Sequence, residues 1–186
     1  MDGMTETLSP LELANEAQAA YRKGDFPAAA QAFELAARGY SAAGDAMMSA
    51  EMLNNSSVAN LRAGQAHAAL KTVEGTPEIF ARAGDIRRQG MALGNLAAAL
   101  ESLNRPGEAM QAYQRSAELL EEAGEFDLRS HVMQSLSALQ LRTGRQLEAL
   151  ATMQSGLERV QRPTRKQRLI KRLLRLPSKL FARTDT

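Results

Sequence analysis

The sequence predicts an all-α fold, a solenoid of four helix pairs with a basic amphipathic helix at its C-terminus. The first observation is a turn signal that recurs every 40 residues, at Gly44-Asp45, Gly84-Asp85 and Gly124-Glu125. The second is another turn series halfway between, at Gly24, Gly64, Asn104 and Gly144. Two alternating series about 20 residues apart leave room for pairs of helices, and such a period is typical of stacked repeats. The third is composition, because helix formers such as alanine, leucine, glutamate and arginine dominate.

The helices can be placed in order from these turns. The first helix of each pair is expected at 10–22, 45–62, 85–103 and 125–142. The second helix is expected at 26–43, 66–82, 106–123 and 145–161. Prolines lie at or near expected helix starts, where a missing N–H costs nothing, at Pro10, Pro27 and Pro106. The predicted organisation is a flexible N-terminus at 1–9, a repeat region at 10–162 with units at about 5–44, 45–84, 85–124 and 125–162, and a tail at 163–186.

The second unit departs from this pattern. The run Glu74-Gly75-Thr76-Pro77 falls where the other units have mid-helix residues. Because proline in a helix interior costs about 3 kcal/mol, this helix is expected to stop near Glu74 and to restart at Pro77. The break is either a kink tolerated on the outer face or a bend that changes the curvature of the superhelix, and both interpretations stay open.

Small and large residues alternate at fixed places in each unit. Two sets of small residues flank the mid-repeat turns: Ala17, Ser57, Ala97 and Ser137 before them, and Ala29, Ala69, Ala109 and Ala149 after them. Helices of a hairpin approach closely only where side chains are small, so these are predicted crossing points. Large residues recur at two further places: Phe33, Val73, Tyr113 and Met153 on the second helices, and Leu13, Leu53, Leu93 and Met133 on the first. They are expected to fill the space between helices.

These residues resemble tetratricopeptide repeats. The shared marks are the small residue of the first helix, the Gly-Asp-aromatic or proline turn, and the alanine and aromatic residue of the second helix, as in NEAQAAYRKGDFPAAAQAFELA and GNLAAALESLNRPGEAMQAYQRSAELL. The usual unit has about 34 residues. This longer period is similar to the variety found in kinesin light chains and polarity scaffold proteins, whereas HEAT-type pairs lack the small-Gly-Ala pattern. The resemblance covers about residues 8–162 and implies a right-handed superhelix whose first helices line the concave surface.

A row of amides marks the expected groove. Nine residues before the mid-repeat turns stand Asn15, Asn55, Asn95 and then Ser135, with Asn54 beside the second. Asparagine carries both a donor and an acceptor, so a row of them can bond the backbone of an extended peptide whatever its sequence. The resemblance implies the same use. The alternative is that these amides bond neighbouring helices, and Ser135 interrupts the row in the fourth unit.

A second row carries positive charge. Two residues before the turns stand Arg22, Arg62 and Arg142, with Ser102 in the third unit. Arginine pairs bidentately with carboxylates, so arginines in the groove of an otherwise acidic body favour a peptide with acidic side chains. The alternative is that they are solvated residues at helix ends, where the helix dipole favours a positive charge.

The net charge of +2 combines two parts of opposite sign. Residues 162–186 hold nine Lys or Arg and one acid, Asp185. Because the whole chain has 23 basic and 21 acidic side chains, residues 1–161 hold 14 basic and 20 acidic ones. In the tail, Leu169, Ile170, Leu173, Leu174 and Leu176 form an apolar stripe at helical spacing. The flanks are basic: Arg165, Lys166, Arg168, Lys171, Arg172 and Arg175. Pro177 is expected to end this helix.

Three interpretations of the tail remain open. It can cap the apolar edge of the fourth pair, since terminal repeats need a polar outer face. It can bind an anionic membrane surface with its basic flanks and Phe181. It can contact a protein partner or another copy of the acidic body. Nucleic acid is disfavoured because the tail has no stacking aromatics interleaved with its basic residues and because the body is acidic.

The sequence offers little to support an enzyme. It has no cysteine, and its two histidines, His67 and His131, are 64 residues apart. Neither a zinc-binding spacing nor a phosphate-binding loop nor a nucleophile elbow occurs. We therefore expect no catalytic residue, no metal site and no cofactor. The acidic N-terminus and the lack of a long apolar run make the cytoplasm the expected location.

The predicted function is a non-enzymatic scaffold that binds an extended peptide or protein segment in the concave groove. Two alternatives are kept, a peripheral membrane adaptor anchored by the tail and a self-associating homo-oligomer. The identity of the partner does not follow from the fold.

Overall fold

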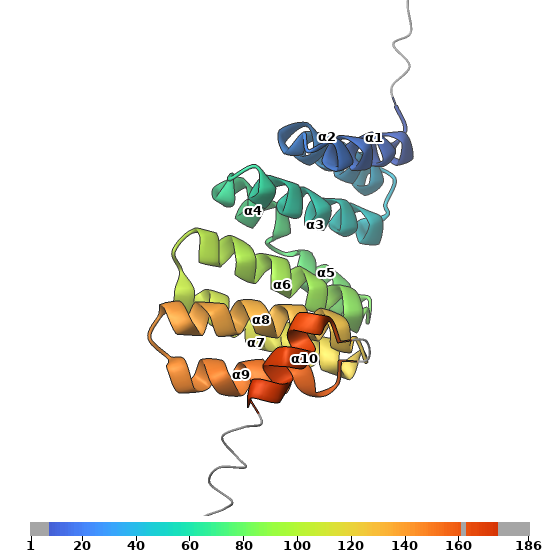
Figure 1. The fold of residues 1–186 in the computed structure, drawn as a ribbon. Coiled ribbons are helices and arrows are strands. Elements are labelled where there is room, and N and C mark those ends of the chain that lie inside the picture. The colour runs from blue at the N-terminus through green and yellow to red at the C-terminus, as the bar shows by residue number, and fades with distance from the viewer. Residues whose placement is uncertain (1–7, 161–162, 175–186) are drawn as a thin grey trace, which may run out of the picture.

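Four helix pairs stack along one axis in the computed structural model, which describes residues 8–160 and 163–174 (Figure 1). The pairs are α1 (Pro10–Lys23) with α2 (Phe26–Ala42), α3 (Ala46–Arg62) with the broken α4 (Ala66–Val73) and α5 (Thr76–Arg82), α6 (Ile86–Ser102) with α7 (Pro106–Glu122), and α8 (Phe126–Arg142) with α9 (Gln146–Glu158). The basic helix α10 (Arg165–Leu174) follows and contacts α9. No strand occurs among the described residues. The predicted all-α superhelix is confirmed.

The repeated turn residues start and end the helices as their chemistry requires. Asp25, Asp45 and Asp85 each accept a hydrogen bond from the backbone N–H three residues on, at 3.2, 2.9 and 2.8 Å. This satisfies a donor that a helix start leaves unpaired. The mid-repeat turns need a left-handed residue, and in the third unit Asn104 takes this conformation with φ 56° where the other units have glycine. The regular spacing of these signals therefore fixes the helix lengths.

The predicted crossing points are confirmed. The four small residues of the first helices and the four alanines of the second helices are all at most 1% exposed. In the fourth unit the two crossing residues bond directly, since the Ser137 hydroxyl donates to the Ala149 carbonyl at 2.8 Å. Close approach at these points brings the larger residues of neighbouring units into contact.

The core is repeated along the solenoid. One cluster joins the first two units around Phe33 and Met52, and another joins the last two units around Tyr113 and Leu136. Met153, the large residue of the last unit, is only half-buried. Burial against the next unit thus provides most of the packing, as expected for a stacked array.

The predicted break in the second unit is confirmed. α4 ends at Val73, Gly75 is left-handed with φ 83°, and α5 begins at Thr76 with Pro77 in its first turn. The Thr76 hydroxyl donates to the Val73 carbonyl at 2.9 Å, so the turn is closed by its own residues. The second helix of the fourth unit also differs from expectation, because it ends at Glu158, before the predicted 161.

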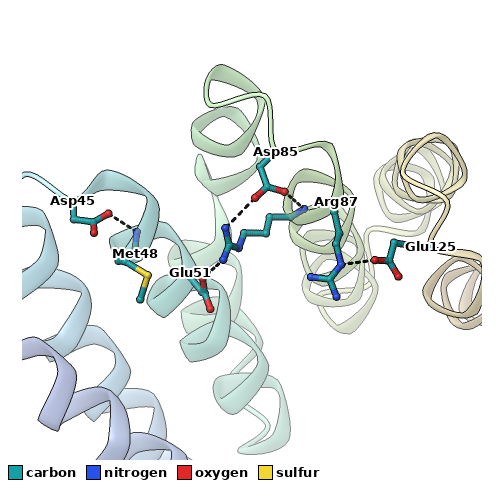
Figure 2. A network of polar contacts seen from close by, with 7 residues as sticks. Asp45, Met48, Glu51, Asp85, Arg87 and Glu125 are labelled. Atoms are coloured by element: carbon teal, nitrogen blue, oxygen red, sulfur yellow. Dashed lines mark hydrogen bonds and ion pairs between the residues drawn. The ribbon is translucent and has the colours of Figure 1, made fainter.

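Ion pairs connect the starts of successive first helices (Figure 2). Arg87 on α6 pairs with Glu125 beside α8 at 2.6 Å, and Arg88 pairs with Glu51 on α3 at 3.0 Å (Figure 2). Arg88 also pairs with Asp85, the residue that caps its own helix, at 3.0 Å. These side chains are substantially exposed, so each pair contributes about 1 kcal/mol or less. They help to set the register between units, while apolar burial holds the units together.

Candidate peptide-binding surface

The first helices α1, α3, α6 and α8 form one surface, here called the first-helix face. A hollow of about 350 Å³ lies on it between α1 and α3, and it is called the N-terminal hollow. Phe33 of α2 forms its floor, and the walls come from the two first helices: Gln18, Tyr21, Arg22, Asn55 and Val58. It is half-open, with an apolar lining and a few polar groups, as peptide and ligand sites commonly are.

A second hollow of about 270 Å³, the C-terminal hollow, lies between α6 and α8. It is the counterpart of the first by repeat register, because Tyr113 of α7 takes the place of Phe33 and Ser135 takes the place of Asn55. Asn95 and His131 also line it. Three positions of the repeat therefore line both hollows: Gln18 and Ala98, Phe33 and Tyr113, and Asn55 and Ser135.

The asparagine row is divided between these hollows. Asn55 lines the N-terminal hollow and Asn95 lines the C-terminal one, while Asn15 is exposed on α1. The Asn95 amide donates to the Asn54 side-chain oxygen at 2.9 Å. Asn54 is 8% exposed, so this bond ties α3 to α6 between the two hollows. Asn15 and Asn55 make no side-chain hydrogen bond within the described part of the chain, so their amides are free for a ligand.

The three arginines of the second row have different surroundings. Arg22 lines the N-terminal hollow, and the Arg62 guanidinium carbon lies 4.7 Å from the centre of the Phe26 ring. Arg142, in contrast, pairs with Glu101 of α6. The arginines therefore do not form one uniform positive row along the face.

The buried phenol of Tyr113 adds a hydrogen bond to the Glu101–Arg142 ion pair beside the C-terminal hollow. The Tyr113 hydroxyl donates to Glu101 at 2.8 Å. Burial, together with the neighbouring Glu101 carboxylate, raises the pKa of Tyr113 well above that of a free phenol. Tyr113 therefore stays protonated and remains a donor, and Glu101 is held by two partners.

The reasoning from the sequence missed this network, although a signal for it exists. Glu101 falls at the place where the other units have Tyr21, Leu61 and Leu141. A charge where the repeat otherwise has an apolar residue needs a partner. Comparing the units at this place would have pointed to Arg142.

A third hollow, of about 450 Å³, lies between α7, α8 and α9 and contains a buried arginine. Arg129 is 9% exposed. Its terminal nitrogens donate to the backbone carbonyl and the hydroxyl of Ser155 at 3.0 and 2.9 Å, and its Nε lies 3.3 Å from Glu121. These partners identify Arg129 as a link between α8 and α9. The sequence had not singled it out.

The tail helix presents part of its predicted basic surface outward. Arg165, Arg168 and Arg172 are exposed on one face of α10, and Leu169 lies among them at 59% exposed. Ile170 and Gln167 are half-buried, and the Gln167 amide donates to the Ser130 hydroxyl of α8 at 3.5 Å. Parts of the prediction lie outside the described residues, namely Arg175, Leu176, Pro177 and Phe181 and the side chains of Lys166, Lys171, Leu173 and Leu174. The described part of α10 thus covers α9 with one face and exposes arginines on the other.

Neither a metal-binding cluster nor a membrane-spanning helix occurs among the described residues. No group of three His, Cys, Asp or Glu side chains that could hold a metal ion occurs among them. None of the helices in 8–160 and 163–174 has the length and apolar character needed to cross a membrane.

Comparison with known proteins places the repeats in a family. Residues 8–171 match the family model described as "SNAP: Soluble NSF attachment protein, SNAP". The match runs from the residue before the first helix cap into α10. The matching model is that of these attachment proteins and not of tetratricopeptide repeats themselves, so the resemblance holds at the coarser level of a TPR-like helical repeat. No curated protein matches the chain.

Proposed function

The chain belongs to the soluble NSF attachment protein family, and from this premise we propose that it is a non-enzymatic adaptor that binds a segment of another protein on its first-helix face. The family is a helical protein-interaction adaptor family without catalysis. The name of the family describes attachment of a partner protein, which suits a scaffold better than a catalyst. The proposed ligand is an extended segment that runs along α1, α3, α6 and α8.

The observation that supports this proposal best is the pair of equivalent hollows. They lie on the same face and share three repeat positions. Each has an asparagine, Asn55 on the α3 wall of one and Asn95 on the α6 wall of the other. An extended strand can fill such hollows with side chains while the amides bond its backbone, which is a recurring mode of peptide recognition.

The test replaces the amides of the first-helix face. Asn15→Ala with Asn55→Ala removes two side chains that have no internal hydrogen bond, so the fold should be unchanged. We expect this variant to capture its partners more weakly from a lysate of the source organism, as measured by mass spectrometry. Adding Asn95→Ala should weaken capture further, but it also frees Asn54, so its thermal unfolding must be measured alongside.

A matched control carries the same kind of change on the second helices. Gln31→Ala with Gln111→Ala removes two exposed amides from α2 and α7. This variant should keep every partner. If a folded Asn15→Ala, Asn55→Ala, Asn95→Ala variant captures the same partners as the unchanged chain, binding on the first-helix face is wrong.

A second candidate function is attachment to an anionic membrane surface through α10. The exposed Arg165, Arg168 and Arg172 with Leu169 among them favour it, since each basic residue near such a surface contributes about 1 kcal/mol. The test is sedimentation with phosphatidylserine vesicles at low salt, with phosphatidylcholine vesicles as control. We expect changing the three arginines to glutamine to abolish sedimentation, and the absence of sedimentation by the unchanged chain would end this candidate.

A third candidate is self-association through the last unit. Leu141, Leu147 and Leu150 are 48%, 83% and 50% exposed there. The mass of the chain in solution, measured by light scattering over a range of concentrations, tests it. A monomer at all concentrations would exclude it.

We further propose the finer division of the chain. The units follow the long tetratricopeptide-like period at about 5–44, 45–84, 85–124 and 125–162, and the tail at 163–186 acts separately. The cytoplasm is the proposed location. Limited proteolysis, which cuts exposed loops between packed units, tests the boundaries.

A further inference from the structure

The two hollows occupy equivalent places in the repeat but differ in charge. Beside the C-terminal hollow, the positions at the end of α6 are Glu101 and Ser102. Beside the N-terminal hollow, the same positions at the end of α1 are Tyr21 and Arg22. A carboxylate in one unit is thus replaced by a phenol in the other, and a neutral residue by an arginine.

This exchange determines whether the arginine on the following first helix has a carboxylate partner. Arg142 of α8 pairs with Glu101, which also accepts the Tyr113 hydroxyl. Arg62 of α3 is the counterpart of Arg142, but the counterparts of Glu101 and Tyr113 are Tyr21 and Phe33. The Arg62 guanidinium lies over the Phe26 ring. Within residues 8–160, neither Arg62 nor Arg22 has a carboxylate at ion-pair distance. The unpaired Arg22 lines the N-terminal hollow. The unpaired Arg62 is connected to the hollow through Phe26, whose ring contacts the lining residue Tyr21. These two arginines are called the positive rim of this hollow.

Most arginines of α1–α9 and their turns are paired, so these two are exceptional. Carboxylates neutralise Arg87, Arg88, Arg105, Arg115, Arg129, Arg142, Arg145 and Arg159. Arg38 and Arg82 are also unpaired in this part of the chain, but they belong to the second helices, on α2 and α5. Within residues 8–160, Arg22 and Arg62 are the unpaired arginines of the first helices, and both are next to Tyr21 or its neighbour Phe26.

The surroundings orient the charge and leave it accessible. Arg62 is exposed, and its guanidinium lies over the Phe26 ring, which makes an edge contact with Tyr21 at 5.3 Å between ring centres. Stacking fixes the plane of a guanidinium while its N–H edges stay free for bidentate bonds to a carboxylate. Asn55 offers a further donor on the same wall.

The interior of the hollow is apolar. Tyr21, Phe33 and Val58 line it, and its volume of about 350 Å³ accommodates a large apolar side chain. An apolar interior with a positive rim matches a short segment in which an apolar side chain has acidic neighbours.

We propose that the N-terminal hollow is the anchor site for an acidic segment of a partner protein. One aromatic or long aliphatic side chain of the segment fills the hollow, and an adjacent aspartate or glutamate pairs with Arg22 and Arg62. The C-terminal hollow, whose arginine is already neutralised, accepts the neutral continuation of the segment. This inference rests on the proposed binding of an extended segment to the first-helix face.

The experiment selects ligands from a random peptide library displayed on phage, with the full-length chain as bait. Three variants accompany it. Tyr21→Glu gives the N-terminal unit the carboxylate of the third unit, and Arg22→Gln with Arg62→Gln removes the positive rim without deleting bulk. Arg142→Gln is the matched control, since it changes the equivalent arginine at the other hollow. Circular dichroism verifies that each variant is folded.

We expect the unchanged chain and Arg142→Gln to select peptides with aspartate or glutamate next to an aromatic or aliphatic residue. Tyr21→Glu and the double glutamine variant should not select them. The selected peptide, labelled and titrated by fluorescence anisotropy, should bind the double variant on the order of tenfold to a hundredfold more weakly, as expected for loss of charge-assisted bonds. Its affinity for the unchanged chain should fall as salt rises from about 0.05 M to about 0.5 M.

Other outcomes separate this inference from the broader one. Selection of peptides without acidic residues, or equal binding by the double variant, would overturn the acidic anchor while supporting the binding of extended segments. Selection of no peptide by the unchanged chain would contradict both. Binding that depends on Arg142 and not on Arg22 and Arg62 would mean that the acidic side chain is recognised at the C-terminal hollow, which contradicts the proposal.

Discussion

Residues at the same place of the repeat have different partners in different units. Phe33 and Tyr113 occupy the same place and are both buried, at 4% exposed. Only Tyr113 has a hydroxyl, and only its unit has Glu101 to receive it. The hydroxyl and the carboxylate therefore depend on each other, because either one buried alone would lose a hydrogen bond.

Tyr113→Phe tests that dependence. We expect the free energy of unfolding to fall by about 1 kcal/mol, since one hydrogen bond to Glu101 is lost while the carboxylate keeps Arg142. Urea denaturation followed by circular dichroism measures it. Tyr40→Phe is the control, because the half-buried Tyr40 makes no side-chain hydrogen bond in the described residues, and its unfolding should be unchanged. Equal effects of the two substitutions would contradict the assigned role.

The end of the array is visible in a second pair of equivalent residues. Met110 is 8% exposed because the fourth unit covers it, and Leu150 is 50% exposed in the unit that follows. Met110→Ala should lower the free energy of unfolding by about 2–5 kcal/mol, as expected for a core truncation. Leu150→Ala should lower it by about 1 kcal/mol or less, because little buried surface is lost. Urea denaturation of both variants checks the difference, and a large loss for Leu150→Ala would show that something covers it.

At the scale of elements, the break between α4 and α5 depends on the backbone of one residue. Gly75 has φ 83°, and an added Cβ would meet no atom within 4 Å. A substitution there is therefore strained by conformation alone. Gly107, in the first turn of α7, is equally open but has no positive φ.

The matched pair Gly75→Ala and Gly107→Ala isolates that strain. Gly75→Ala should destabilise the protein by about 1–2 kcal/mol, the cost of a left-handed alanine. Gly107→Ala should stabilise it by up to about 1 kcal/mol, because alanine is the better helix former. Thermal unfolding by circular dichroism gives both signs. A neutral Gly75→Ala would mean that the turn can rearrange.

At the scale of the whole molecule, the solenoid has separate hydrophobic clusters along its length in place of one common core. Phe33 and Leu136 belong to different clusters at opposite ends. Each unit is therefore stabilised mainly by its neighbours, and damage should stay local.

Leu136→Ala tests this locality. Leu136 is 3% exposed, so its truncation should cost about 2–5 kcal/mol. We expect amide hydrogen exchange, followed by mass spectrometry, to speed up in α7, α8 and α9 and to remain nearly unchanged in α1 and α2. Phe33→Ala should give the mirror image. Uniform acceleration over all helices would mean that the chain unfolds as one cooperative unit.

Much of the fold could be predicted because its signals are local. Caps such as Asp45 and the left-handed Asn104 act within one turn, and the small residues at the crossing points recur with the period. The sites were harder to predict. Asn95 was expected either to bond a ligand or to bond a neighbouring helix, and its amide bonds Asn54 of the preceding unit, as in the second interpretation. The register of either helix alone does not decide between the two.

By itself, the sequence determined the period, the helix lengths and the place of the break in the second unit, because turn chemistry and helix spacing depend on near neighbours in the chain. Only the tertiary structure decided which polar side chains have a hydrogen-bond or ion-pair partner within the protein. Arg62 and Arg142 look alike in the sequence, yet one lies against Phe26 and the other pairs with Glu101. The physical reason is that a charge is satisfied by whatever group lies within a few ångströms in space, and in a solenoid that group comes from another unit.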